Sequence, residues 1–401
     1  MKIKEKIQSN IWKLYGYYFF HNFILAYVIE RLYWEQRGMT IQHVVYTEII
    51  YAVIIVILEV PTGYWADAWS RKNLIVLGSI FTCLEFAILI FAYEFWHFAL
   101  AIGVAAIQKA LCSGAINALL YDSLKMTARE NDFEKVLGRI RFFDYGSVTL
   151  AALLGSVVAV RFGFLSNYWL SLFSTIISLG FAIVLIEPSK GKIETGDVNK
   201  KYIKQALSFL KEHKSVRFVL VLGIVIGVNM VYLDEFWQIY LREINIPIIF
   251  FGVIGSINSM IVSISSLGAY KIKDRLDEGK LYTALISVFS FSFILLSFTK
   301  SIYGLLFTIL IYASSSIIEP LVSGYLHHKV ESSYRATIES FQSLALRVAT
   351  MGVGLVFGKI STELSIFEGF RFIGILSFIY LIYYVISQRK YLSNGSSQNM
   401  N

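Results

Sequence analysis

The strongest constraint on this chain is a series of apolar runs, each about twenty residues long, separated by short polar segments. A run of that length matches a helix that crosses roughly 30 Å of hydrocarbon. Lipid offers no hydrogen-bond partner to the backbone, so a spanning segment must be a helix or part of a closed barrel, whose strands are about half as long. Hydrophobic residues make up 56% of the 401 residues and charged residues only 16%. We therefore predict an all-α membrane protein.

The apolar runs predict twelve transmembrane helices, six on either side of a polar stretch. The predicted spans are 13–33, 41–62, 73–93, 97–121, 138–160, 166–187, 215–237, 248–270, 281–298, 302–325, 334–358 and 367–387. The predicted domains are an N-terminal six-helix bundle (1–187), a cytoplasmic central loop (188–214), a C-terminal six-helix bundle (215–390) and a disordered cytoplasmic tail (391–401). Two halves of similar layout are typical of secondary transporters, in which the substrate path runs between the halves.

Basic residues are distributed unequally between the two sets of predicted loops. Of the 36 Lys and Arg residues, 26 fall on the side of the N-terminus, 7 fall on the opposite side, among them Arg31 at the outer end of the first span, and Lys109, Arg141 and Arg347 are intramembrane. The positive-inside rule then places both termini in the cytoplasm. The same bias toward an anionic leaflet explains the net charge of +8 without a nucleic-acid partner. The abundance of Ile, Tyr, Phe and Lys indicates a bacterium, so we expect a monomeric, multi-pass protein of the bacterial cell membrane, with the lipid bilayer as its surroundings.

The stretch EVPTGYWADAWSRK, residues 59–72, interrupts the apolar sequence between the second and third spans. A short cytoplasmic turn must satisfy two helix ends and let their backbones approach closely. Gly63 removes a side chain at that contact, and Asp67 can face a helix N-terminus. Arg71 and Lys72 mark the cytoplasmic side. A charged turn that only sets the topology is the simpler interpretation.

The same stretch resembles the signature loop of the major facilitator superfamily, which reads roughly G-x-L-A-D-R-x-G-R-K. Gly63, Asp67, Arg71 and Lys72 stand at matching positions, and other positions of the loop depart from the signature. The resemblance implies two six-helix bundles that rock against each other. It also implies a gating latch, in which the arginine of the loop pairs with an acid at the inner end of the fourth span. Asp122 is the matching candidate.

Ionisable side chains within the predicted spans of the first half are the best functional candidates, because a charge at mid-span costs roughly 2.5 to 3.5 kcal/mol. Lys109 lies near the middle of the fourth span, and Glu85 lies at a similar depth in the third. Lys109 resembles the cation of a second family motif, which implies coupling to protons or substrate. A structural pair between Glu85 and Lys109 is the alternative. Arg141 and Asp144, three residues apart on the fifth span, form either a neutral pair or a proton site.

The second half carries its own intramembrane charges. Glu319 precedes Pro320 in the tenth span, where the proline frees a carbonyl group and loosens the helix. Glu339 and Arg347 lie eight residues apart on the eleventh span. We expect Glu319 to face Arg347 or Lys109 and to couple proton binding to transport, with structural pairing as the alternative.

The family resemblance also places the first, fourth, seventh and tenth spans around a central cavity. His21 and Asn22 in the first span, and Asn229 and Tyr232 in the seventh, would then contact the substrate. An aromatic cavity with few polar groups suits amphipathic or drug-like molecules better than sugars. Packing within each bundle is the other interpretation of these residues.

These features predict a secondary active transporter that moves small amphipathic or drug-like molecules by alternating access, with efflux driven by the proton gradient. No residue fixes the direction, so an importer or facilitator of a small metabolite is an alternative. A membrane receptor or immunity protein without transport is another. An enzyme is not expected, because the sequence has no H-E-x-x-H, G-x-S-x-G or Walker pattern. We accordingly assign no catalytic residue, no metal and no cofactor other than the proton gradient.

Overall fold

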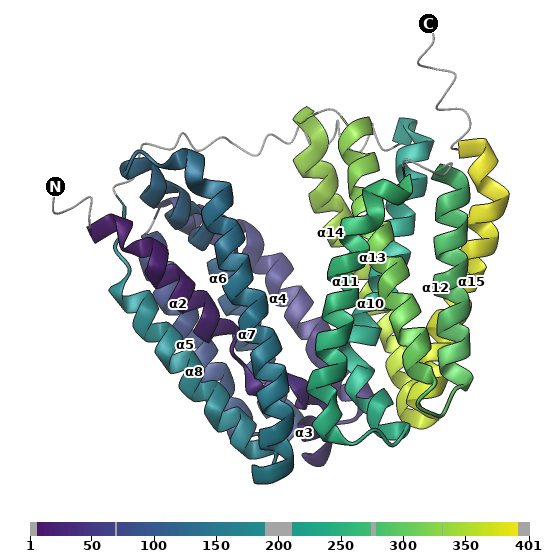
Figure 1. The fold of residues 1–401 in the computed structure, drawn as a ribbon, viewed down its shortest axis with the longest axis horizontal. Coiled ribbons are helices and arrows are strands. Elements are labelled where there is room, and N and C mark those ends of the chain that lie inside the picture. Colours follow the sequence, from purple (N-terminus) through teal and green to yellow (C-terminus); the bar gives the residue numbers. More distant parts are fainter. Residues whose placement is uncertain (1–5, 69, 189–210, 274–277, 331, 392–401) are drawn as a thin grey trace, which may run out of the picture. The chain divides into compact units, whose positions relative to one another are not determined.

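The computed structural model describes residues 6–68, 70–188, 211–273, 278–330 and 332–391. These residues form helices and no strand (Figure 1). The elements are α2 (Asn10–Asn22), η1 (Leu25–Val28), α3 (Glu30–Gln36), α4 (Ile41–Ala68), α5 (Arg71–Ile90), α6 (Phe95–Met126), η2 (Glu130–Asp132), α7 (Phe133–Phe162), α8 (Phe164–Val184), α10 (Lys214–Glu243), η3 (Ile248–Phe250), α11 (Phe251–Lys273), α12 (Glu278–Phe298), α13 (Gly304–Lys329), α14 (Ser332–Glu363) and α15 (Ile366–Tyr391). Within these described ranges, eleven helices are long and apolar enough to cross a membrane. The predicted all-α membrane fold is confirmed.

The contacts divide the chain into two compact units. The first comprises Met1–Thr195 with Pro247–Ser256, and the second comprises Gly196–Ile246 with Ile257–Asn401. The first unit thus holds the elements from α2 to α8, and the second holds most of the elements from α10 to α15. The predicted central loop and tail fall largely outside the described residues, so those domain boundaries stay a prediction.

The second predicted span is longer than expected. The sequence predicts its end at residue 62, but α4 continues to Ala68, through Pro61 and Gly63. Proline removes one backbone donor from a helix, and a hydroxyl side chain can bond a nearby backbone carbonyl within the same helix. The carbonyl that Pro61 leaves without its helical donor is that of Ile57, and the Thr62 hydroxyl donates to the neighbouring Leu58 carbonyl at 2.7 Å. The helix therefore continues past Pro61 and six residues beyond its predicted end.

The first predicted span, 13–33, is not one helix. It is divided into α2, η1 and α3, with the break at residues 23–29. At Ile24 the backbone is extended, with φ −107° and ψ 99°, so the regular ladder of helical hydrogen bonds is interrupted there. A break inside a membrane requires other partners for the freed backbone groups.

Those partners come from one face of α8. The Asn167 amide donates to the Leu25 carbonyl at 2.8 Å, and the Ser171 hydroxyl accepts from the Ala26 N–H at 3.0 Å. One turn further along α8, the Ser174 hydroxyl donates to the Phe20 carbonyl at 2.7 Å. Residues three and four apart lie on the same helix face, so α8 presents a continuous polar stripe to the interrupted segment. This stripe explains why the break is tolerated.

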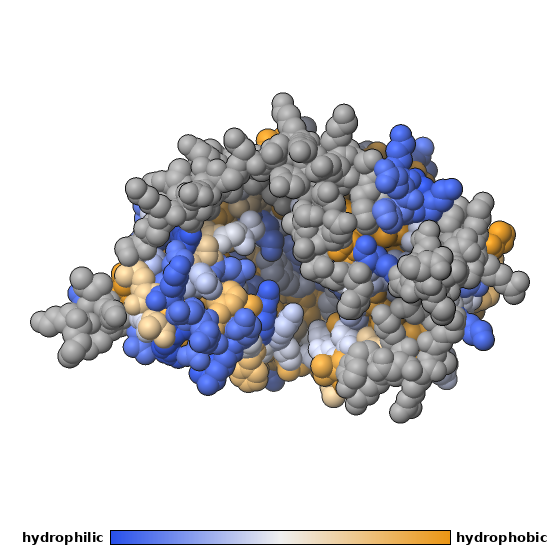
Figure 2. Space-filling view, turned by 90° about the horizontal axis from the view of Figure 1, so that it is seen from above, coloured by the Kyte–Doolittle hydropathy of each residue, from blue (hydrophilic) through white to orange (hydrophobic). Residues whose placement is uncertain are grey.

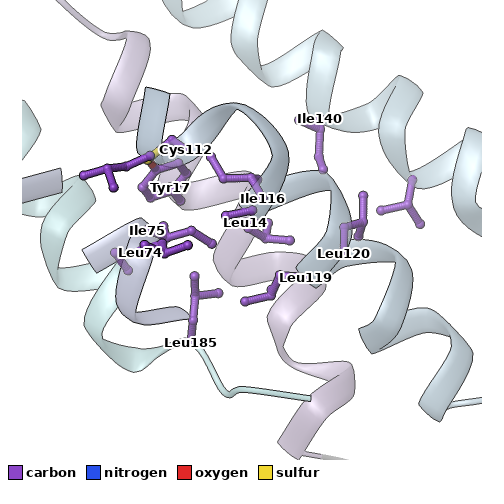
Figure 3. Close-up of a cluster of buried hydrophobic side chains, with 14 of the residues drawn as sticks. Leu14, Tyr17, Leu74, Ile75, Cys112, Ile116, Leu119, Leu120, Ile140 and Leu185 are labelled. Atoms are coloured by element: carbon purple, nitrogen blue, oxygen red, sulfur yellow. The ribbon is translucent and has the colours of Figure 1, made fainter. Parts of the chain in front are cut away.

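The middle of α2 packs into the apolar core of the first unit (Figure 3). Leu14 and Tyr17 of α2 lie against Leu74 of α5 and Leu119 of α6, and all four side chains are fully buried. A side chain added at Gly78 would collide with Cys112 Sγ, so the Cys112 side chain of α6 packs directly against the backbone of α5 there. This close packing fixes the relative position of the two helices that carry the candidate latch.

Candidate functional site: a basic latch and a polar helix face

The start of α5 is held by an ion pair to α6. Arg71 is only 5% exposed, its guanidinium Nη1 contacts the Asp122 carboxylate, and Nη1 also donates to the Ala118 carbonyl at 3.0 Å. The ion pair expected between Arg71 and Asp122 is therefore formed, and its role in gating stays a prediction. A guanidinium buried against both a carboxylate and a carbonyl is held in place by two charge-assisted hydrogen bonds.

A second carboxylate reaches the same helix start. Glu187, which lies three residues beyond the end of α8, accepts from the Ser70 hydroxyl at 2.8 Å, from the Arg71 N–H at 3.0 Å and from the Lys72 N–H at 2.7 Å. The Ser70 hydroxyl in turn accepts from the Asn73 N–H at 3.2 Å, as a helix N-cap does. A carboxylate at this position also favours the helix dipole. Sequence reasoning missed Glu187, because its partners lie more than a hundred residues earlier in the chain.

The other two residues of the predicted motif give less information. Gly63 and Asp67 belong to the helical backbone of α4, but their side chains lie outside the described residues. Their proposed contributions to gating stay predictions.

One face of α6 is polar along its length. Lys109, Ser113, Asn117 and Tyr121 are spaced four residues apart, which places them on one side of the helix, and all four are exposed on the first unit. A charged residue near the middle of a membrane helix avoids lipid and faces a wetted or polar space. This face is the strongest candidate on α6 for a surface that lines a transport path.

Side chains from α2 and α7 complete this polar surface. Lys109 lies within electrostatic range of both the His21 ring and the Asp144 carboxylate. His21 stacks on Tyr17 with ring centroids 5.3 Å apart, and Arg141 Nη1 lies 3.3 Å from Asp144 Oδ2. His21 and Asp144, which the sequence singled out separately, thus both interact electrostatically with Lys109.

Two other predictions for the first unit have different outcomes. The alternative pair between Glu85 and Lys109 is not formed, because the charged side chain that interacts with Glu85 is Glu30. Asn22 lies at the end of α2, where its amide donates to the Tyr18 carbonyl at 3.2 Å. This intrahelical bond leaves the proposed substrate contact of Asn22 a prediction.

In the second unit, the two predicted cavity residues of α10 are bonded to neighbouring helices. The Asn229 amide donates to the Ser377 hydroxyl of α15 and to the Val225 carbonyl, both at 2.8 Å. The Tyr232 hydroxyl donates to the Thr350 carbonyl of α14, and its ring stacks on Phe357 with centroids 4.7 Å apart. These contacts hold α10 against α14 and α15, and a substrate role for Asn229 or Tyr232 stays a prediction.

The predicted coupling residues of the second unit are Glu319 and Arg347. Glu319 is exposed on α13 directly before Pro320, and Arg347 is half-buried on α14. Across the described part of this unit, no ion pair joins Glu319 to Arg347. A polar contact that the sequence did not indicate links Asp234 of α10 to α13, where the Tyr312 hydroxyl donates to Asp234 Oδ1 at 2.7 Å.

No group of three or more His, Cys, Asp or Glu side chains in the described ranges could hold a metal ion.

Figure 2 looks down onto the end of the first unit where α6 is connected to α7, and hydrophilic side chains gather at this end. The connection between α6 and α7 carries the exposed Lys125, Glu130, Glu134 and Lys135. A charged end above an apolar bundle is typical of the water-facing end of membrane helices.

Comparisons with known proteins agree with this architecture. A family profile described as Major Facilitator Superfamily matches residues 14–351. The uncharacterized MFS-type transporter YxaM of Bacillus subtilis is 23% identical over 342 residues, which cover 82% of this chain and 83% of that protein. An uncharacterized transporter of Buchnera aphidicola subsp. Acyrthosiphon pisum is 24% identical over 324 residues and 77% of each chain.

Solved structures share the fold. A mutant form of the nucleoside transporter NupG has a TM-score of 0.77 and 13% identity, with coverage of 96% of this chain and 99% of that chain. A bacterial homolog of the human lysosomal transporter Spinster, in an inward-facing and unoccupied conformation, has a TM-score of 0.68 and 14% identity, with coverage of 97% and 98%. At this identity the likeness concerns the fold alone.

Proposed function

Because this chain belongs to the major facilitator superfamily, whose matched relatives are bacterial membrane transporters, we propose that it exports small amphipathic molecules by alternating access, driven by proton entry. In this proposal the protein lies in the bacterial cell membrane with both termini in the cytoplasm. It acts as a monomer, needs no cofactor beyond the proton gradient, and has the substrate, protons and lipid as its partners.

The observation that carries the proposal is the polar surface around Lys109. Lys109 is exposed on α6 and interacts electrostatically with His21 and Asp144. On the same two helices, the Tyr15 ring of α2 stacks on the Phe143 ring of α7 with centroids 5.2 Å apart. Rings beside a few charged groups favour a molecule with an aromatic body and a polar end.

The latch at the start of α5 supports a two-state mechanism. In our proposal, the contact between Arg71 and Asp122 stabilises one orientation of the transporter and is lost or rearranged in the other. A ligand shifts such an equilibrium only by binding the two states with different affinity. A carboxylate that binds a proton in one orientation and releases it in the other provides that difference.

A flux experiment tests the proposal. Cells expressing the wild type would be loaded with a panel of fluorescent dyes and antibiotics, and inverted vesicles would then receive an imposed pH gradient. We expect proton-stimulated export of at least one amphipathic compound, and loss of that export in Lys109→Ala and Glu319→Gln. Lys359→Ala, an exposed lysine on α14, is the matched control and should retain export.

Other outcomes of the same experiment would overturn the proposal. Accumulation of a compound inside expressing cells would support an importer or facilitator in place of an exporter. Export that is unaffected by the pH gradient would remove proton coupling. An absence of flux for every compound, in a protein that is folded and inserted, would support a receptor or immunity protein.

A further inference from the structure

A carboxylate of the second unit is held by a bond between two helices. Asp234 lies within the predicted seventh span, nine residues before the end of α10. The Tyr312 hydroxyl of α13 donates to Asp234 Oδ1 at 2.7 Å, and Tyr312 is only 8% exposed. The other carboxylate oxygen, Oδ2, has no hydrogen-bond partner among the described residues. One oxygen of this carboxylate is therefore fixed, and the other can accept a ligand.

Asp234 is exposed although its helix is enclosed by others. From Leu222 to Arg242, a stretch that the structure describes completely, Asp234 is the one exposed residue of α10. A helix that faces lipid exposes a row of apolar side chains instead, as α11 does with Met260, Ile264 and Leu267. An ionised side chain also avoids hydrocarbon. Asp234 therefore opens into a polar or wetted recess.

Packing along α10 shows where this recess lies. Gly223, Gly227 and Asp234 fall on one face of the helix, because they are separated by four and then seven residues. A Cβ at Gly223 would lie 3.0 Å from Val322 Cγ1 of α13. A Cβ at Gly227 would lie 2.9 Å from Leu346 Cδ1 of α14. The neighbouring helices thus cover this face at the two glycines and leave it open at Asp234.

Among the described residues of the second unit, no basic side chain forms an ion pair with Asp234. The sequence of α10 has no basic residue between Arg217 and Arg242, and Arg242 Nη2 lies 2.6 Å from Glu243 Oε1. A carboxylate without a counter-charge is costly within a membrane helix. A bound cation removes that cost, so the recess favours a positively charged ligand.

An organic cation fits this recess better than a metal ion. A metal ion such as Ca²⁺ requires several oxygen ligands, and no group of three or more His, Cys, Asp or Glu side chains in the portion of the chain that the structure describes could hold one. Met230 and Trp237, four residues before and three residues after Asp234, share its helix face and are half-buried. Aromatic rings attract organic cations, and Tyr312 adds a second ring beside the carboxylate.

We propose that Asp234 and Tyr312 form a site of the second unit that binds the charged group of an amphipathic organic cation. The proposal rests on the proposed transport function and names the charge of the substrate. Asp234 contacts the cation directly, and Tyr312 orients the carboxylate through its hydroxyl group.

Binding can be measured without any flux. The purified full chain would be reconstituted in lipid nanodiscs and titrated with tetraphenylphosphonium, an organic cation, and with tetraphenylborate, an anion of nearly the same shape. Empty nanodiscs correct for partition into lipid. We expect saturable binding of the cation and not of the anion. Asp234→Asn should weaken binding of the cation by about tenfold or more, because the attraction between opposite charges is lost. Glu243→Gln, at an exposed position on the same helix, is the matched control.

Two further variants separate the charge from an effect on folding. Asp234→Glu keeps the charge and should retain most of the affinity for tetraphenylphosphonium. Tyr312→Phe keeps the ring and removes the hydroxyl group, so it should weaken binding by about fivefold, as expected for one hydrogen bond. Equal binding by the wild type and Asp234→Asn would overturn the proposal. Saturable binding of tetraphenylborate, or no saturable binding of tetraphenylphosphonium, would do the same.

The result is independent of the direction and the driving force of transport, because no gradient is imposed. Charge-selective binding without proton-driven export would refute only the proposed export. Proton-driven export by a protein whose cation binding is unchanged in Asp234→Asn would refute only this site.

Discussion

Replacing Glu187 tests whether the candidate latch depends on the carboxylate that caps α5. Glu187 accepts three hydrogen bonds at the start of this helix, two from backbone N–H groups and one from the Ser70 hydroxyl. A hydrogen bond to a charged group is worth about 1.5 to 3 kcal/mol, and an anion at a helix N-terminus adds about 0.3 to 1 kcal/mol. Glu187 is half-buried, so solvent replaces part of this stabilisation. We therefore expect Glu187→Ala to cost about 2 kcal/mol in total.

The two cysteines of the chain provide the assay. Cys112 is buried on α6 and Cys83 is half-buried on α5, so a thiol-reactive fluorogenic dye reports the unfolding of the unit that Glu187 caps. For a unit of this size, a loss of about 2 kcal/mol lowers the melting temperature by about 4 to 8 °C. Glu187→Gln keeps one acceptor oxygen and should show about half of that decrease. Glu363→Ala removes an exposed glutamate and serves as the control.

Glu187 and Asp122 should also be energetically coupled, since both bond to Arg71. The double variant Glu187→Ala with Asp122→Asn should differ from the sum of the single variants by more than about 0.5 kcal/mol. Melting of Glu187→Ala together with the wild type and the control would refute the argument. Strict additivity with Asp122→Asn would show that the cap and the ion pair are independent.

Two further predictions concern the break in the first span. A Cβ at Gly155 would lie 2.6 Å from the Leu25 carbonyl oxygen, so Gly155→Val should lower the free energy of unfolding by about 1 to 3 kcal/mol in the thiol melting assay. Gly146→Val, at a glycine with open space around it, should have little effect. Equal melting of the two variants would contradict the close packing. Asn167→Ala removes both hydrogen bonds that the buried Asn167 amide donates, so it should lower the free energy of unfolding by about 2 kcal/mol. Asn131→Ala, at an exposed position, is the control. A wild-type melting curve for Asn167→Ala would show that α8 does not stabilise the break.

The sequence carries clear signals for the spans and for one contact of the site. Apolar length alone locates the second to twelfth spans, because lipid allows little choice other than a helix. The pairing of Arg71 with Asp122 could also be predicted, since both residues belong to a recognisable pattern. Lys109 and Asp144 were identified as unusual because ionisable groups are rare within spans.

Features that depend on distant partners could not be predicted in this way. The segment FILAYVI, which includes the break in the first span, contains neither Gly nor Pro, and its stabilising partners Asn167 and Ser171 lie more than 140 residues away. Arg31 was expected at the outer end of the first span, but it is buried beside Glu30 of the same helix and Glu48 of α4. Glu187 gave no local signal, because a glutamate before a proline is also a common way to end a helix.

The cap and the ion pair have a mechanical consequence for the first unit. At one end of α5, the carboxylates of Glu187 and Asp122 bond to its first turn. These contacts hold α5, α6 and the residues after α8 rigidly together. Near the opposite end of α5, the jointed first span rests on a row of hydroxyl and amide groups, a more compliant support than a continuous helix. Bending within this unit should therefore concentrate around the joint, while the braced end turns as a rigid block.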